Sequence, residues 1–267
     1  QRTELKMFDA IIEFRRRLQA GEVLLGTGIY MTDPQASAAL ADSTDFFWFD
    51  LEHQAMSIDT LRTHLLTVRH NKTPAIVRVP PSDAPLVQNV LDAGAHGIVA
   101  AQVRTVAEVE SVVAECRYPP VGRRGFWPMI PTNYCRDDMG QYIKQADADL
   151  FVAVMIETAE AVEAIDEIVA VDGLDGVVLG LMDLSGSYGL LGQGDHPKVV
   201  AAMDKVIASA RAAGLPVGCG QGTDVKRICS LARHGIQWFQ AGADCLYLVT
   251  FMEQLSAAVR DELEGHS

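Results

Sequence analysis

The sequence predicts an α/β protein that folds as a (β/α)8 TIM barrel. Short apolar runs alternate with amphipathic helical patterns, and several runs are apolar throughout, as in parallel strands buried on both faces. About eight strand–helix units are present, which is typical of this barrel. Polar residues follow many of the runs: Asp50, Glu52, His53, Arg78, Gln102, Glu157, Asp183 and Gln221. In a barrel these positions meet on one face, whereas an open doubly wound sheet, the alternative, would spread them along a line.

The predicted elements cover the chain in order, and we expect one domain over residues 1–267. Apolar residues at helical spacing within residues 1–22 predict an N-terminal helix. Strands are predicted at 22–30, 46–50, 75–79, 97–101, 151–156, 176–180, 215–218 and 236–240. Helices are predicted at 34–42, 57–70, 85–93, 105–116, 158–169, 197–213 and 223–234, with an extended C-terminal helix at 245–263. Ser57 and Thr158 are predicted to begin helices, and Gly214 to end one. The irregular segment 117–149 is expected to be a long loop.

Charge and cysteine content narrow the class of protein. The chain has 22 basic and 35 acidic residues, a formal charge of −13 and an isoelectric point near 4.9. Such a surface disfavours binding to nucleic acids and to anionic membranes. The five cysteines form no C-x-x-C pair, and we expect neither a signal peptide nor a membrane span. These features favour the cytoplasm.

Two carboxylates are candidate metal ligands. Glu157 and Asp183 each follow an apolar run, in VAVMIE and GVVLGLMD, one strand–helix unit apart. Neighbouring units of a barrel place such residues side by side, and paired carboxylates suit Mg²⁺ or Mn²⁺. Alternatively, one of them caps the next helix or pairs with an arginine. No lysine stands near a predicted strand end, which disfavours a Schiff-base mechanism.

Three further residues are candidates for catalysis. His53, after FFWFDLE, has the residue type and position of a general base, although a structural role stays open. Arg78, inside AIVRV, either holds an oxyanion or forms a buried ion pair with Asp50 or Glu52. Asp92 lies at the C-terminal end of a predicted helix, where the helix dipole disfavours a carboxylate. It should therefore have a cationic or hydrogen-bonding partner, with a histidine as one candidate.

Seven motifs in this order resemble the metal-dependent class II pyruvate aldolases. They are FDLEH (49–53), VRVP (77–80), LDAGAHGI (91–98), RYPPVGRRG (117–125), VMIET (154–158), VDGLDGVVLGLMDLS (171–185) and AGADCLYL (241–248). The resemblance extends from about residue 22 to 255. This family is typified by 4-hydroxy-2-oxoheptanedioate aldolase and 2-keto-3-deoxy sugar-acid aldolases, and it includes macrophomate synthase.

The resemblance implies a role for each matching residue. Glu157 and Asp183 would bind the metal, Mg²⁺ or Mn²⁺ with Co²⁺ as a further candidate. His53 would be the acid–base residue, supported by Asp92 from a neighbouring position in the assembly or fold. Arg78 would bind the keto oxygen and stabilise the enolate.

The resemblance also implies contacts with the substrate carboxylate and a hexamer. The carboxylate would lie near Ser185 and the backbone of residues 180–183, including Gly180 and Met182. The hexamer would be built from dimers that exchange the last helix.

The chain departs from the family around the expected pocket. The first strand segment reads TGIYM (27–31) without the common tryptophan, Met155 replaces a frequent glutamine, and Gly180-Leu181-Met182-Asp183 replaces Gly-Pro-Ala-Asp. The loop 124–134 is bulky and apolar. We therefore expect residues 126–130, together with Met155 and Met182, to line the acceptor pocket and to favour an apolar or aromatic aldehyde over a sugar aldehyde.

Together these features predict a divalent-metal-dependent carbon–carbon lyase that acts on a 2-oxo acid and an aldehyde. Two other functions remain open at this point. The same enolate would arise in the decarboxylation of oxaloacetate or another β-keto acid. A non-catalytic barrel that binds a 2-oxo acid is disfavoured, because the candidate metal ligands, the histidine and the arginine are all present.

Overall fold

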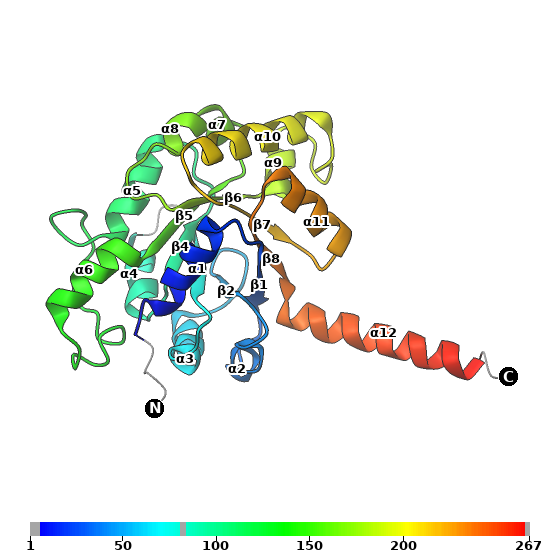
Figure 1. Cartoon of the computed structure of the whole chain (residues 1–267), viewed down its shortest axis with the longest axis horizontal. Helices are drawn as coiled ribbons and strands as arrows, with labels where there is room; N and C mark the ends of the chain where they lie inside the picture. The colour runs from blue at the N-terminus through cyan, green and yellow to red at the C-terminus, as the bar shows by residue number, and fades with distance from the viewer. Residues whose placement is uncertain (1–5, 81–83, 265–267) are drawn as a thin grey trace.

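A closed barrel of eight parallel strands forms the centre of the computed structural model, which describes residues 6–80 and 84–264 (Figure 1). Each strand pairs with the next along the chain, and β8 closes the barrel against β1. The strands are β1 (Leu24–Ile29), β2 (Phe46–Asp50), β3 (Ala75–Val79), β4 (Gly97–Ala100), β5 (Phe151–Ile156), β6 (Gly176–Leu179), β7 (Val217–Gln221) and β8 (Trp238–Ala243). The predicted barrel and its eight strands are confirmed.

Helices surround the barrel, with the predicted ones in the predicted order and two others, at Met139–Asp149 and Leu181–Ser187, that were not predicted. They are α2 (Gln35–Leu40), α3 (Ile58–Val68), α4 (Ala84–Asp92), α5 (Val106–Cys116), α6 (Met139–Asp149), α7 (Ala159–Glu163), α8 (Ile165–Ile168), α9 (Leu181–Ser187), α10 (Pro197–Ala212) and α11 (Val225–His234). Ser57 and Thr158 cap α3 and α7 as predicted, because their side chains accept backbone N–H groups of Thr60 and Ala161. The helix predicted at 158–169 is divided at Ala164 into α7 and α8.

The N-terminal helix α1 (Asp9–Gln19) closes the amino end of the barrel. Its Phe14 ring makes edge contacts with Phe46, Phe151 and Trp238, with centroids 5.4, 5.5 and 6.0 Å away. These rings come from the first residues of β2, β5 and β8. The aromatic cluster therefore fills the amino end, and the carboxyl ends of the strands remain for a functional site.

The segment 117–149 contains a helix that was not predicted. Helix α6 begins after Asp138, whose side chain accepts the backbone N–H of Gln141 at 2.6 Å. Only Tyr142 and Ala146 of this helix are buried, so its apolar side is too narrow to stand out in the sequence. The expectation of a loop over the whole segment was wrong.

The apolar residues 126–130 lie at the amino end of the barrel, because their segment connects the end of α5 to the start of β5. Ile130 faces Gly94, beyond the end of α4, where an added Cβ would meet the isoleucine at 3.6 Å. The ring of Phe126 contacts Tyr118, with centroids 5.4 Å apart. Within a single chain, these residues therefore lie at the opposite end of the barrel from the carboxyl ends of the strands. The prediction that residues 126–130 line the acceptor pocket of their own chain is wrong.

The last helix, α12 (Asp244–Glu264), extends away from the barrel (Figure 1). Its first residue, Asp244, is buried and accepts the backbone N–H groups of Tyr30 and Met31 at 3.1 Å each, which anchors the helix beside β1. Its large apolar side chains are exposed: Leu246, Leu248, Val249, Phe251, Met252, Leu255, Val259 and Leu263. In the described part of the chain, no helix combines the length and apolarity needed to cross a membrane.

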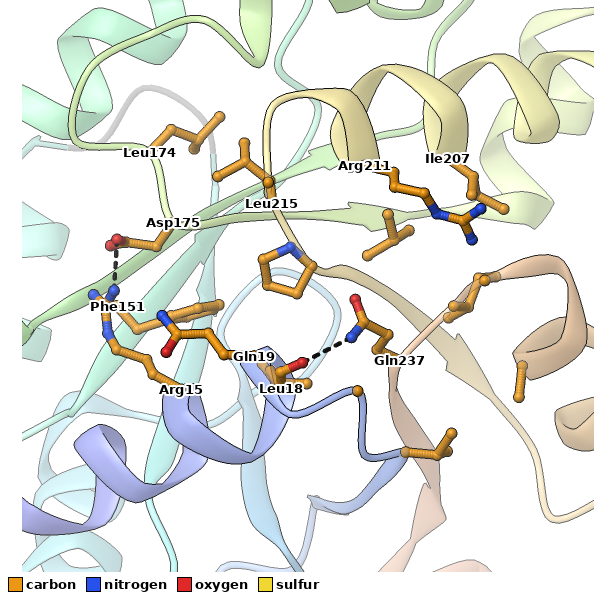
Figure 2. Close-up of a pocket in the computed structure, with 18 residues that line it drawn as sticks. Arg15, Leu18, Gln19, Phe151, Leu174, Asp175, Ile207, Arg211, Leu215 and Gln237 are labelled. Atoms are coloured by element: carbon orange, nitrogen blue, oxygen red, sulfur yellow. Dashed lines mark hydrogen bonds and ion pairs between the residues drawn. The ribbon is translucent and has the colours of Figure 1, made fainter.

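A cavity of about 580 Å³ lies at the amino end of the barrel, between α1, α10 and the residues that precede β8 (Figure 2). Arg15 Nη1 binds Asp175 Oδ1 at 2.7 Å beside it, and Gln237 Nε2 donates to the Leu18 carbonyl at 2.9 Å. None of the predicted site residues lines this cavity. It is therefore separate from the site described next.

Candidate active site

The carboxyl ends of neighbouring strands bring most of the predicted site residues to one face of the barrel. Asp50 and Arg78 are paired residues near the ends of β2 and β3. Glu157 follows the last residue of β5, and Asp183 lies in the first turn of α9, shortly after β6. The barrel topology thus produces the predicted grouping.

Arg78 forms a buried network with two carboxylates. Its side chain binds Asp50 through Nε, at 3.0 Å, and through Nη2, while Nη1 lies 3.1 Å from Glu52 Oε2. Burial would raise the pKa of Asp50, but the hydrogen bond and charge of Arg78 outweigh it and hold that pKa below its ordinary value. The ion pair considered for Arg78 is present. Its Nη1 also lies 3.8 Å from Met155 Sδ, toward β5.

Glu157 is a buried carboxylate, and the positive charge near it does not offset the effect of burial on its pKa. Burial raises its pKa to about 7, the charges of Glu52 and Asp183 act in the same direction, and a hydrogen bond from the Gln102 backbone opposes them. That N–H lies 2.6 Å from Oε1. A Cβ at position 180 would lie 2.5 Å from Oε2, so only Gly180 leaves room for this carboxylate. A divalent cation bound here would supply positive charge and hold the carboxylate in its deprotonated form.

Asp183 is exposed and follows β6, the strand paired with the β5 strand that precedes Glu157, so the two predicted metal ligands lie on neighbouring strand ends. Within residues 6–80 and 84–264, no group of three His, Cys, Asp or Glu side chains is arranged to hold a metal ion. A cation here would take two protein carboxylates, with water or substrate oxygens as its other ligands. Mg²⁺ accepts such a site, since it usually keeps several waters.

Glu52 and His53 follow β2 at the edge of the site. The Glu52 side chain is 9% exposed, and among the described residues its Oε2 has no hydrogen-bond partner despite the ion-pair contact with Arg78. His53 is 56% exposed, and its Nε2 lies 3.8 Å from the same oxygen. The imidazole can therefore contact both solvent and the buried carboxylates.

Two other predicted residues have structural partners in this chain. Asp92 ends α4, on the side of the amino ends of the strands, and its Oδ1 accepts from Arg124 Nη2 at 2.8 Å. Arg124 is therefore the cationic partner that we expected for Asp92 at the end of a helix. Within one chain, Asp92 does not lie near His53. Ser185 is fully buried; it donates to the Met182 carbonyl at 2.6 Å and accepts the Gly192 N–H at 3.1 Å.

Gln102 belongs to the site, although its sequence predicts no specific role. It follows β4 with φ = 51°, in the left-handed region that a residue with a side chain rarely adopts. Its backbone N–H binds Glu157, and its side-chain Nε2 donates to Glu52 Oε1 at 2.7 Å. The only signal in the sequence is that a polar residue follows an apolar strand.

The fold and the site together define a (β/α)8-barrel enzyme with an acidic site at the carboxyl ends of its strands. The chain belongs to the HpcH/HpaI aldolase/citrate lyase family, whose sequence profile matches residues 32–249. This membership confirms the predicted resemblance and the enzyme class, an aldolase or related lyase.

Individual relatives agree with the family assignment. The chain is 32% identical to a hydroxypyruvate/pyruvate aldolase of Roseobacter denitrificans, over 76% of this chain and 81% of the relative. It is 31% identical to a 4-hydroxy-2-oxo-heptane-1,7-dioate aldolase of Salmonella newport, over 95% of this chain and 97% of the relative. The crystal structure of macrophomate synthase superimposes with a TM-score of 0.84 and 27% identity, covering 99% of this chain and 92% of the other.

Proposed function

We propose that this protein is a divalent-metal-dependent aldolase that makes or cleaves a 4-hydroxy-2-oxo acid through the enolate of pyruvate or a related 2-oxo acid. The carrying observation is that Glu157 and Asp183 follow the adjacent strands β5 and β6 at the barrel face where Arg78 lies. The relatives named as hydroxypyruvate/pyruvate and 4-hydroxy-2-oxo-heptane-1,7-dioate aldolases support the same reaction class.

The residues present fit a divalent cation. Burial raises the pKa of Glu157 to about 7, and in the described part of the chain the buried Oε2 of Glu52 has an ion-pair contact with Arg78 but no hydrogen bond. Glu157 and Asp183 would hold Mg²⁺, Mn²⁺ or Co²⁺ through hard oxygen atoms. When bound, the cation would act as a Lewis acid that stabilises negative charge on the keto oxygen of the substrate.

Arg78 is assigned to the oxyanion. Asp50 occupies Nε and Nη2, which fixes the guanidinium plane and leaves Nη1 facing Glu52 and Met155. We assign Nη1 to the keto oxygen, where negative charge grows as the enolate forms. Because the plane is held before the substrate arrives, this donor needs little reorganisation during the reaction.

His53 is assigned to proton transfer. In synthesis its half-exposed ring takes a methyl proton of pyruvate and gives it to the alkoxide oxygen formed from the aldehyde, and in cleavage the same transfers run in reverse. We propose that, in the assembly, Asp92 of a second copy of the chain supports this histidine. Gly180 and Met182 are assigned to the substrate carboxylate through their backbone, with Ser185 holding the loop that carries them.

We further propose a homo-oligomer, a hexamer by resemblance to the family. The exposed apolar side chains of α12 support association, since an extended helix with such a surface is rarely left in water. The cytoplasm is the proposed compartment, consistent with five free cysteines.

Proton NMR of pyruvate in D₂O tests the proposed reaction without knowledge of the aldehyde. Enzyme with Mg²⁺ or Mn²⁺ should replace the methyl protons by deuterium, and exhaustive chelation should stop this exchange. The matched controls are Glu157→Gln and Asp183→Asn, which retain size but lose the charge that a cation needs. Exchange that persists at the same rate after chelation, or substrate trapping by borohydride, would contradict the proposal.

A further inference from the structure

We propose that Gln102 is a positioning residue of this active site, which holds Glu52 through its side-chain amide and Glu157 through its backbone N–H. The inference rests on the proposed aldolase function, because it assigns Gln102 a part in enolate formation. No motif in the sequence marks this residue. Its role follows from two contacts and one unusual backbone angle.

The backbone of Gln102 directs both of its donors to carboxylates. The chain leaves β4 with φ = 51° at this residue, a conformation that disfavours residues with a side chain. The N–H donates to Glu157 Oε1 at 2.6 Å, and Nε2 donates to Glu52 Oε1 at 2.7 Å. One residue thus connects a carboxylate that follows β2 to another that follows β5.

The side-chain contact determines how Glu52 meets its neighbours. With Oε1 bound by Gln102, the other oxygen lies 3.1 Å from Arg78 Nη1 and 3.8 Å from His53 Nε2. Glu52 therefore stands between the residues assigned to the oxyanion and to proton transfer. Without the amide, the carboxylate is free to rotate and bind Nη1 with both oxygens. Arg78 would then offer this nitrogen less effectively to the substrate.

The two contacts of Gln102 can be separated experimentally. Any residue other than proline keeps the backbone N–H that binds Glu157. The contact with Glu52 requires the side-chain amide. Changes to the side chain should therefore slow enolisation and leave the affinity for the metal nearly unchanged, whereas a general disturbance of the site would alter both.

The test compares Gln102→Met and Gln102→Gly with the wild-type enzyme. Methionine removes the amide at similar length, and glycine also relieves the backbone strain. In both, pyruvate methyl exchange in D₂O should fall at least tenfold, while the Kd for Mn²⁺ measured by calorimetry stays within about threefold. Gln145→Met, on α6, should match the wild type in both measurements. Exchange within twofold of the wild type in both variants, or a parallel loss of Mn²⁺ affinity, would overturn the proposal.

A second measurement does not depend on turnover. The free energies of unfolding of Gln102→Met, Glu52→Ala and the double variant form a cycle that reports the contact between these side chains. The effects should be non-additive, and additive effects would overturn the proposal. If the wild-type enzyme with metal exchanges no protons, the aldolase proposal fails, and this cycle still decides whether Gln102 holds Glu52.

Discussion

Replacing Arg78 with lysine should slow pyruvate methyl exchange by two to three orders of magnitude and leave metal affinity nearly unchanged. The arginine side chain is 11% exposed and binds Asp50, which is 1% exposed, through two nitrogens. Its third nitrogen, Nη1, lies near Glu52 at the site. A lysine keeps the charge but offers one nitrogen, and the buried Asp50 would compete for it.

The expected magnitudes follow from the contacts that are lost. Removal of one preorganised oxyanion donor costs on the order of 10²–10³ in rate, which corresponds to about 3–4 kcal/mol. A hydrogen bond to a charged group contributes about 1.5–3 kcal/mol to stability. Since lysine can retain one of the two contacts with Asp50, the free energy of unfolding should fall by about the same 1.5–3 kcal/mol.

Arg117→Lys is the matched control for this loss of stability. Arg117 is also buried, and its Nη2 binds the Leu150 and Gly173 carbonyls and Asp175 at the amino end of the barrel. The control should lose comparable stability and exchange pyruvate protons at the wild-type rate. Exchange is followed by NMR well below both unfolding temperatures, and Mn²⁺ affinity by calorimetry.

Two results would refute the reasoning about Arg78. Exchange near the wild-type rate in Arg78→Lys would mean that the arginine only neutralises Asp50 and Glu52. An equal loss of exchange in Arg117→Lys would mean that the rate reports the general stability of the barrel.

Three further predictions concern the metal ligands. Gly180→Ala places a Cβ 2.5 Å from Glu157 Oε2 and should weaken Mn²⁺ binding at least tenfold by calorimetry; unchanged affinity would show that Glu157 is not a ligand. Chelation should abolish aldol cleavage, and added Mg²⁺ or Mn²⁺ should restore it; full activity in the chelated enzyme would exclude the metal role. The pKa of Glu157 rises from 4.5 to about 7 on folding, so this group stabilises the metal-free protein less as pH increases between these values. Relative to Glu157→Gln, the wild-type unfolding temperature should therefore fall across this range, and parallel curves would contradict the assigned pKa.

The sequence predicted the barrel because each strand carries its own signal. A run such as 46–49 is apolar on both faces, which is typical of a buried parallel strand, and its polar neighbours Glu52 and His53 indicate where the strand ends. Helix α6 carried a weaker signal, since only Tyr142 and Ala146 are buried. The direction in which α12 leaves the barrel had no signal in the sequence. An amphipathic pattern indicates that a helix has an apolar side, but it does not indicate what packs against that side.

The sequence by itself determined the fold class, the family resemblance and the residues that follow the strands, because local periodicity and motif order are properties of the chain. Only the tertiary structure decided which of these residues meet. It paired Arg78 with Asp50, placed Asp92 beside Arg124, and connected Glu52 to Glu157 through Gln102. These partners are separated by 28 to 55 residues, and their distances depend on strand register and backbone angles. Neither quantity can be read from spacing along the chain.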